Sequence, residues 1–470
     1  MFFRETLPFI KDFIALLSEA LEKHSPKNRL SLAQKGFLSF CLMGIVVTNT
    51  VCWARFERAS LKERTSACLC WMFRCSRIPW NLLFRMGIRV ILWRYGIDEG
   101  VLVVDDSDHK RAKKTTRIHL AHKIFDKKTN GYFNGQTIVF LVLVSNSITI
   151  PVGFAFYSHD PVLKAWEKED KKLCKKKVKK ANRPPKPIRN PKFPTKEKLA
   201  VELLSQFAQY HSEVKVNAVN GDNHYSTASF ISEVERIFER NTQVISCLKL
   251  TQKVQYKNKY ISVQNYFAKQ NKPIKQKIRK RGGELINVEL ASARLKVYSH
   301  RKKRFLIAIR YEGQENFTYV CASNLTWRTK DITETWTLRW LVEVFIEDFK
   351  EYEGWGQLAK QQGAEGSSRG LILSLLCDLA LFLHPSQEAS FKNKRPAFTV
   401  GSLLRKSRAE ATVEFFKEMV VQKEGQQKLN KLYQKIEEVF ELKPSKKHMS
   451  GRESARMEPT PSLIRHAHVN

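Results

Sequence analysis

The sequence predicts a mixed α/β fold in which helices flank a sheet, an all-α segment comes first, and a second group of strands is inserted late in the chain. Three observations support this prediction. Residues 1–95 carry apolar side chains at helical spacing. At Gly96 the period changes, and β-branched runs typical of buried strands begin with Val101–Val104. Strand patterns return between about residues 250 and 330, and an amphipathic helix follows.

The first 95 residues are expected to form an all-α domain. Basic side chains recur along it, so it either binds DNA, in the manner of a helix-turn-helix, or serves only for packing. Phe37–Ala54 is largely apolar but is interrupted by Thr48-Asn49-Thr50, and we expect a buried core helix there rather than a membrane span. Helices are expected at Pro8–Lys23, Ser31–Ala54, Ser60–Arg74 and Pro79–Arg94.

The charge of the chain indicates a polyanionic partner. Its 470 residues include 82 Lys and Arg against 46 Asp and Glu, a formal net charge of +36. Such an excess destabilises a compact chain by self-repulsion unless a polyanion binds it, so we expect nucleic acid and no membrane. No G-x-x-x-x-G-K-[ST] loop occurs, which disfavours ATP-driven work. Nine scattered cysteines and an N-terminus without a signal-peptide pattern indicate a reducing cytoplasm.

Acidic residues come directly after the first expected strand. Val101–Val104 is followed by Asp105, Asp106, Ser107 and Asp108. Carboxylates at the end of a central strand are well placed to hold a metal at the edge of the sheet, whereas the plain alternative is a polar turn. Two further strands, Gln136–Ser145 and Ile148–Phe156, are expected to form a hairpin through Asn146-Ser147.

A second acid follows a later strand. Val214–Val219 has a strand pattern and is followed by Gly221 and Asp222, after which Ser226 or Thr227 can open a helix. A strand, an acid and a helix in this order place a carboxylate at the same edge of the sheet. The alternative is an ordinary turn between a strand and a helix.

Two segments are expected to be exposed and basic. Lys171–Lys192 contains 11 basic residues, four prolines and no acid, so it should form a solvated loop that follows DNA phosphates. It precedes an amphipathic helix at Lys196–Tyr210. Beyond Pro385 the chain is basic and helical to about Leu442, and Pro444–Asn470 should be disordered.

The amphipathic stretch Thr335–Gln357 follows the inserted strands, which are expected at Asn287–Val297, Arg304–Tyr311 and Asn316–Ala322. As one helix, it would bury Leu338, Val342, Phe345, Phe349 and Tyr352 on one face and carry Trp336, Arg339, Glu343 and Lys350 on another. An acid flanked by an Arg and a Lys suits a divalent metal beside a polyanion. The alternative is an ordinary solvated helix face.

The spacing W-x2-R-x3-E-x6-K in this stretch resembles the Y-x2-R-x3-E-x6-K pattern of DDE transposases from bacterial insertion sequences. Asp222 followed by Tyr225 also matches that family, as does a β-rich insertion between the second Asp and the Glu. Trp336 is a departure, because the family usually has Tyr there. The resemblance covers about residues 101–384. It implies an RNase H-like catalytic domain at 96–385 with its insertion at about 250–330, between a helical domain at 1–95 and a basic region at 386–470.

This resemblance implies an enzyme that cuts double-stranded DNA at the terminal inverted repeats of its insertion sequence. It then joins the 3′-OH ends to target DNA by phosphoryl transfer with two Mg²⁺ or Mn²⁺ ions, as a DNA-bound homodimer near the bacterial nucleoid. Alternatives are a decayed, non-catalytic DNA-binding protein and another RNase H-like nuclease. The implied catalytic and metal-binding residues are Asp105, Asp222 and Glu343, with Asp106 as the alternate to Asp105, and the implied DNA contacts are Trp336, Arg339, Lys350 and Tyr225.

Overall fold

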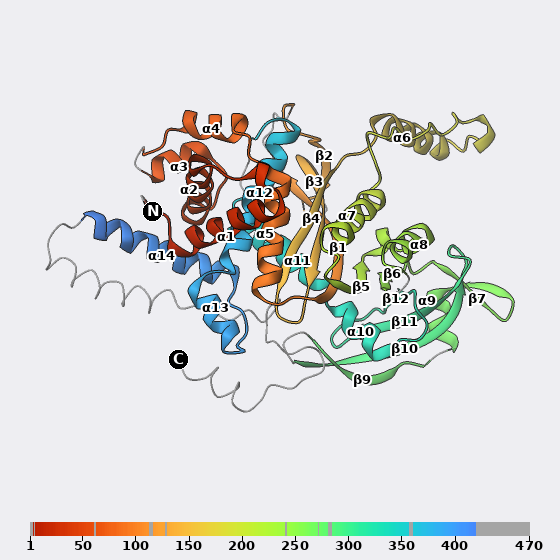
Figure 1. Cartoon of the computed structure of the whole chain (residues 1–470). Coiled ribbons are helices and arrows are strands. Elements are labelled where there is room, and N and C mark those ends of the chain that lie inside the picture. The colour runs from red at the N-terminus through yellow and green to blue at the C-terminus, as the bar shows by residue number, and fades with distance from the viewer. Residues whose placement is uncertain are drawn as a thin grey trace.

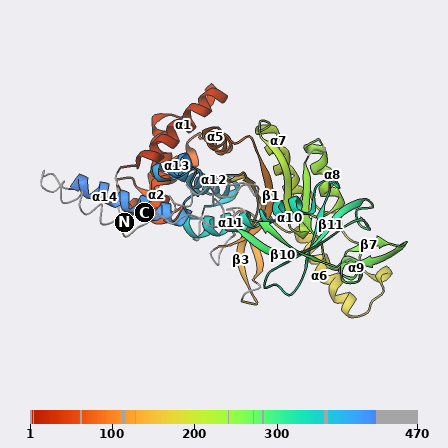
Figure 2. The same ribbon diagram turned by 90° about the horizontal axis from the view of Figure 1, so that it is seen from below.

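The computed structural model describes residues 3, 5–60, 63–111, 116–126, 129–239, 242–270, 272–280, 284–356 and 361–419. It confirms the mixed α/β prediction, because one large mixed sheet is flanked by helices (Figures 1 and 2). The region expected to be disordered, Pro444–Asn470, lies outside the described residues, as does the predicted helical stretch beyond Met419.

Within the described residues the sheet has twelve strands, in the order β2-β3-β1-β5-β6-β12-β11-β10-β7-β8, with β4 also paired to β3 and β9 to β10. The central strand β1 is antiparallel to β3 and parallel to β5, and β5 is parallel to β6. The hairpin expected between the second and third strands is present as β3 and β4. The strands are β1 (Glu99–Lys110), β2 (His122–Asp126), β3 (Gly131–Val144), β4 (Thr149–Tyr157), β5 (Lys215–Gly221), β6 (Gln243–Cys247), β7 (Lys253–Tyr256), β8 (Lys259–Ser262), β9 (Ile274–Arg279), β10 (Leu285–Val297), β11 (Lys303–Tyr311) and β12 (Thr318–Ala322).

The aspartates that we expected after the first strand lie inside it. β1 continues to Lys110 because β3 pairs with it along its whole length, from Val101 opposite Val144 to Lys110 opposite Gly135. Consecutive side chains of a strand point to opposite faces of the sheet. The side chains of Asp105 and Asp106 therefore point to opposite faces of the sheet. In the polar turn that was the alternative interpretation, they would not have been separated in this way.

The inserted strands extend the same sheet. β12 pairs with β6, and β11, β10, β7 and β8 follow outward, with helix α9 (Val263–Gln270) packed on β7 and β8. This end has a hydrophobic cluster of its own, which includes Val254, Phe267 and Tyr319. The helix and the strands β7, β8 and β9 are absent from the sequence-based expectation, because short polar and basic segments carry little periodic signal.

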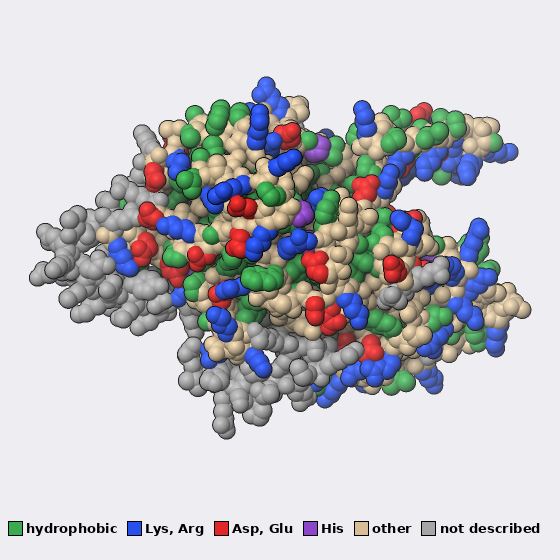
Figure 3. All heavy atoms as spheres, viewed as in Figure 1, with side chains coloured by type: hydrophobic (Ala, Val, Ile, Leu, Met, Phe, Trp, Pro, Cys, Tyr) green, Lys and Arg blue, Asp and Glu red, His purple; other side chains and the backbone are tan. Residues whose placement is uncertain are grey.

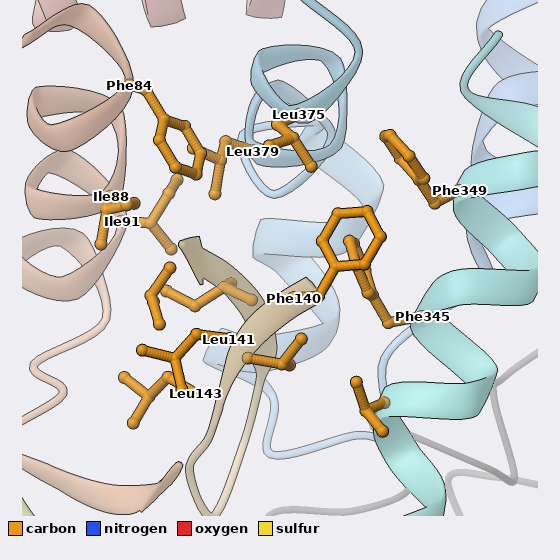
Figure 4. Packing of buried hydrophobic residues seen from close by; sticks show 14 of the residues in the cluster. Phe84, Ile88, Ile91, Phe140, Leu141, Leu143, Phe345, Phe349, Leu375 and Leu379 are labelled. Carbon is orange, nitrogen blue, oxygen red and sulfur yellow. The ribbon is translucent and has the colours of Figure 1, made fainter. Parts of the chain in front are cut away.

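The helices on one side of the sheet bury the main core. Phe140 on β3 contacts the rings of Phe345 and Phe349 on helix α11, and Leu375 of α12 packs nearby (Figure 4). The N-terminal helices pack on α12 and share this core. The helices in question are α1 (Pro8–His24), α2 (Leu32–Thr48), α3 (Trp53–Ala59), α4 (Ser66–Cys75), α5 (Trp80–Arg94), α11 (Trp340–Tyr352), α12 (Gly363–Leu381), α13 (Pro385–Lys392) and α14 (Val400–Met419).

The prediction of a single helix at Ser31–Ala54 is wrong. It is two helices, α2 and α3, because Asn49 adopts a left-handed conformation with φ 51° and ends α2. The Asn49 side chain donates to the carbonyl of Glu351 and accepts from the amide of Gly354 at 3.1 Å, so it ties this end to the end of α11. No single helix in the described ranges is long and apolar enough to cross a membrane, although two pairs of helices bent at a break reach that length together.

The segment expected to be a basic loop, Lys171–Lys192, forms the outer part of an arm (Figure 1), and its first five residues are helical rather than a loop. Helix α6 (Pro161–Lys175) leads outward and the chain returns to α7 (Lys196–Tyr210), whose bounds match the prediction. The buried Asp160 holds the base of this arm, since its carboxylate accepts from the amides of Val162 and Asn190 at 2.9 and 2.8 Å. Farther out, Trp166 donates to the carbonyl of Pro184 at 2.9 Å.

Candidate active site

Two of the predicted carboxylates lie on neighbouring strands. The parallel register pairs Val104 of β1 with Gly221 of β5, so Asp105 and Asp222 are the next residues of adjacent strands. Gly221 must lack a side chain here, because a Cβ would stand 2.7 Å from the Cβ of Tyr225. The carboxylate of Asp222 accepts from the amide of His224 at 2.8 Å, which fixes it at the start of a short 3₁₀ turn, η3 (Asn223–Tyr225).

The pKa of Asp105 is strongly perturbed by its surroundings. Burial raises the pKa of Asp105 to about 7, and the negative charges of Asp106 and Asp222 act in the same direction. The backbone amide of Asp106 and the guanidinium of Arg339 oppose this shift. A carboxyl group that is costly to ionise beside another acid is typical of sites that bind a cation.

The stretch Thr335–Gln357 is not one helix, which corrects the prediction. Helix α10 (Thr329–Thr337) ends and α11 begins at Trp340, with Leu338 and Arg339 between them. The backbone tightens there into hydrogen bonds three residues apart, from the amide of Arg339 to the carbonyl of Trp336 at 3.1 Å and from Leu341 to Leu338 at 3.0 Å. The tightened turn shifts side chains around the axis relative to a continuous helix.

The apolar face of α11 was predicted correctly. Of its five predicted residues, Val342, Phe345 and Phe349 are buried in the core, whereas Leu338, which precedes the helix, and Tyr352 are half-buried against it. The helix ends at Tyr352, and Gly354 follows with φ +81°, where a Cβ would lie 2.9 Å from the backbone of Thr50. The predicted end at Gln357 lies outside the described residues.

β5 holds the break between α10 and α11 beside the two aspartates. The side chain of Asn220, which is fully buried, donates to the carbonyl of Thr335 at 2.7 Å. Asn220 stands two residues before Asp222 in the chain. Sequence reasoning missed this residue, because a polar side chain before a turn gives no sign of a partner more than a hundred residues away.

Arg339 joins the first and third carboxylates. Its Nη1 lies 3.4 Å from Oδ2 of Asp105, and its Nη2 forms an ion pair with Glu343 on the next turn. The Arg339 side chain is only 21% exposed, less than expected for a residue on the face turned away from the core. Because both acids pair with it, the guanidinium supplies the positive charge that this cluster needs.

Trp336 and Tyr225, which were expected to contact DNA, are buried. Trp336 packs in the core, and the Arg339 guanidinium stands 5.5 Å from the centre of its ring. Tyr225 is fully buried against Phe230, and its hydroxyl has no hydrogen-bond partner within the described part of the chain. Tyr225 therefore belongs to the core, whereas Trp336 is mostly buried but also lines the groove beside Arg339.

Asp106, the alternate first carboxylate, has a different partner. It forms an ion pair with Lys196, the first residue of α7, and both side chains are largely buried. The structure therefore brings Asp105, and not Asp106, to Arg339 and Glu343. Sequence reasoning did not identify Lys196 as part of this region, since its role depends on where the arm returns to the sheet.

Lys350 lies two turns beyond Glu343 and lines one of two open grooves near α11. This groove, of about 1020 Å³, runs past Asp108 and His109 at the far end of β1 and past Phe125 on β2. A groove of about 700 Å³ lies on the other side of Arg339 and is lined by Trp340 and Lys280, among others. Both grooves are open to solvent, and residues of α11 line each of them.

The donor set suits a hard divalent cation, because all three acids are carboxylates. As arranged here, however, Arg339 stands between Asp105 and Glu343. The described residues contain no group of three or more His, Cys, Asp or Glu side chains that could hold a metal ion. A divalent cation would therefore require these side chains to rearrange.

What the fold and site define is a mixed α/β protein with a cluster of acids on the central strands of its sheet. Comparison with models of known protein families and with curated proteins found no match.

Proposed function

We propose that the protein is a metal-dependent DNA transposase with an RNase H-like catalytic domain, in which Asp105, Asp222 and Glu343 are the catalytic carboxylates. The observation that carries the proposal is the convergence of these acids, which are more than a hundred residues apart in sequence, on adjoining elements. The strand order β4-β3-β1-β5-β6, with β1 parallel to β5, supports it, because that order is the one expected for this fold.

In this proposal each residue has a separate role. Asp105, Asp222 and Glu343 would hold two divalent ions, which supply activation of the attacking hydroxyl and stabilisation of the leaving oxygen. Arg339 exchanges its carboxylate partners for a DNA phosphate, which a guanidinium binds with two hydrogen bonds. Lys350 contacts a second phosphate farther along α11, and Asn220 positions the turn that carries Arg339.

The alternative is a DNA-binding protein without catalytic activity. One observation favours it, namely that the Arg339 guanidinium pairs with both Asp105 and Glu343. Both proteins would bind DNA, but only the transposase would cut and join its strands.

The test is cleavage of a labelled fragment that carries the DNA flanking the protein's own gene. We expect cuts at a discrete position with Mg²⁺, none without metal, and a loss of about 10³-fold or more in rate for Asp222→Asn and Glu343→Gln. Glu347→Gln, an exposed change on the same helix, is the matched control and should cleave normally. Specific binding with no cleavage under any divalent metal would establish the alternative, and undiminished cleavage by both variants would refute the assigned residues.

A further inference from the structure

The outer end of the strand insertion carries cations and tyrosines but no carboxylates. Between residues 249 and 283 the sequence contains eleven Lys and Arg and no Asp or Glu, and residues 290–311 also lack acids. Tyr260 and Tyr298 are 43% and 58% exposed there, and their rings pack edge to face with centroids 5.0 Å apart. Paired aromatic rings exposed among lysines are unusual for a surface that contacts only water.

This end of the insertion is fixed beside the candidate active site. His300, in the turn between β10 and β11, lies with Nε2 2.8 Å from the carbonyl oxygen of Ser226, just after the turn that begins at Asp222. The buried Arg304 pairs with Glu235 on helix α8 (Ala228–Ile237) at 3.4 Å. These two contacts hold Tyr298 and the exposed Lys302 and Lys303 near the second catalytic carboxylate.

The basic arm begins and ends beside Asp106, the neighbour of Asp105 on β1. Lys196, at its return, pairs with Asp106, and the ring of Tyr157, just before it, lies 5.3 Å from the Lys196 ammonium. The arm and the insertion project toward the same side of the molecule, the right in Figure 1, and the space-filling view shows open space between them (Figure 3). Lys and Arg side chains gather along the arm and at the end of the insertion, on both sides of this space (Figure 3).

We propose that the Tyr260–Tyr298 surface of the insertion and the α6 arm are the two sides of one channel for double-stranded DNA. The channel holds the duplex across the site, independently of base sequence. The lysines contact phosphates, and the tyrosines pack on sugars or on bases that unstack near the cut. The inference rests on the proposed function, from which it takes the substrate, but it assigns a separate surface and is tested by binding alone.

The test is fluorescence anisotropy of a labelled duplex of arbitrary sequence, measured with the full chain over a series of salt concentrations without divalent metal. We expect Lys257→Gln, Lys259→Gln and Lys302→Gln together to weaken binding about tenfold or more and to reduce the slope of log Kd against log salt by about 2–3. Tyr260→Ala with Tyr298→Ala should weaken binding about threefold to tenfold and leave the slope unchanged.

The matched control replaces three exposed lysines on the helical side, Lys27, Lys392 and Lys394, with Gln. Affinities and slopes of the insertion variants equal to those of the control would overturn the proposal. It would also be overturned if polyglutamate of equal charge displaced the duplex more strongly than unlabelled DNA did, because the partner would then be an acidic protein. If instead the variants weaken binding as expected but the wild type never cleaves DNA, the channel stands and the transposase assignment fails.

Discussion

Arg339 occupies the position where the free protein most needs positive charge. Asp105 is buried, Asp222 adds to the negative potential, and Glu343 lies one turn along the helix. Three carboxylates in such proximity repel one another unless a cation lies among them. Arg339 supplies that cation in the free protein, and a divalent metal would compete with it for the same oxygens.

From this competition we expect Arg339→Gln to raise the affinity for Mn²⁺ in the absence of DNA by about tenfold. A glutamine leaves both carboxylates free to bind a metal while keeping much of the side-chain volume. Electron paramagnetic resonance of free Mn²⁺ measures the affinity directly. Arg328→Gln, whose ion pair with Asp331 is exposed, is the control, and equal Mn²⁺ affinity in all three proteins would show that Arg339 does not compete with metal.

At the residue scale the sequence correctly placed Asp222 after a strand and Glu343 on an amphipathic helix. It could not decide between Asp105 and Asp106, because the choice depends on which face of β1 each side chain occupies. Nor could it show that Trp336 and Tyr225 are buried, since an aromatic residue near a polar cluster fits a surface and a core equally well.

At the scale of elements, a buried acid pair joins α11 to α12. Glu353 follows α11 and Asp378 lies within α12, and their carboxyl groups interact in the core. Burial raises the pKa of Asp378 to about 7, and burial together with the charge of Asp378 raises the pKa of Glu353 well above its usual range. Both groups therefore keep their protons at pH values where the unfolded chain has lost them.

Since the native state binds more protons than the unfolded chain, the free energy of unfolding should fall as the pH rises from about 4 through 7 and above. We expect Asp378→Asn to be more stable than the wild type at pH 8.5 by about 1–2 kcal/mol, and to differ little at pH 5. Urea unfolding at the two pH values measures this difference. A stability gain that is the same at both values would mean that the pair does not titrate in this range.

Element boundaries were predictable where propensity and tertiary contacts agree. Helix α7 matches its predicted bounds, because Thr195 caps it and its apolar stripe faces β3 and β4. The breaks at Asn49 and Arg339 were not predictable, since each depends on a distant partner: Asn49 binds the end of α11, and β5 holds Thr335.

At the scale of the whole molecule, one sheet connects the helical layer, the acid cluster and the strand insertion. The pairing of β3 with β4 followed from their sequence, because consecutive strands with a short connection pair as antiparallel neighbours, whereas β2, which lies between β1 and β3 in the chain, was not predicted. The continuation of the sheet through β12 could not be read from the chain, since β6 and β12 are separated by about seventy residues of insertion.

The arm should contribute affinity for DNA that depends on salt and not on sequence. Replacing Lys175, Lys176, Lys179 and Lys180 with Gln removes four exposed charges, so we expect the slope of log Kd against log salt to fall by about 3–4. Filter binding to two unrelated duplexes checks that the loss is the same for both. Unchanged salt slopes would mean that the arm does not contact DNA.

The central claim is that Asp105, Asp222 and Glu343 form one metal site when DNA is bound. Replacing Mg²⁺ with Fe²⁺, in the presence of duplex DNA, ascorbate and peroxide, generates hydroxyl radicals that cut the protein backbone next to the bound metal. We expect cuts near residues 105, 222 and 343, suppressed by excess Mg²⁺ and lost in Asp222→Asn. Cuts at other positions, or no cuts that Mg²⁺ suppresses, would contradict the assignment of this site.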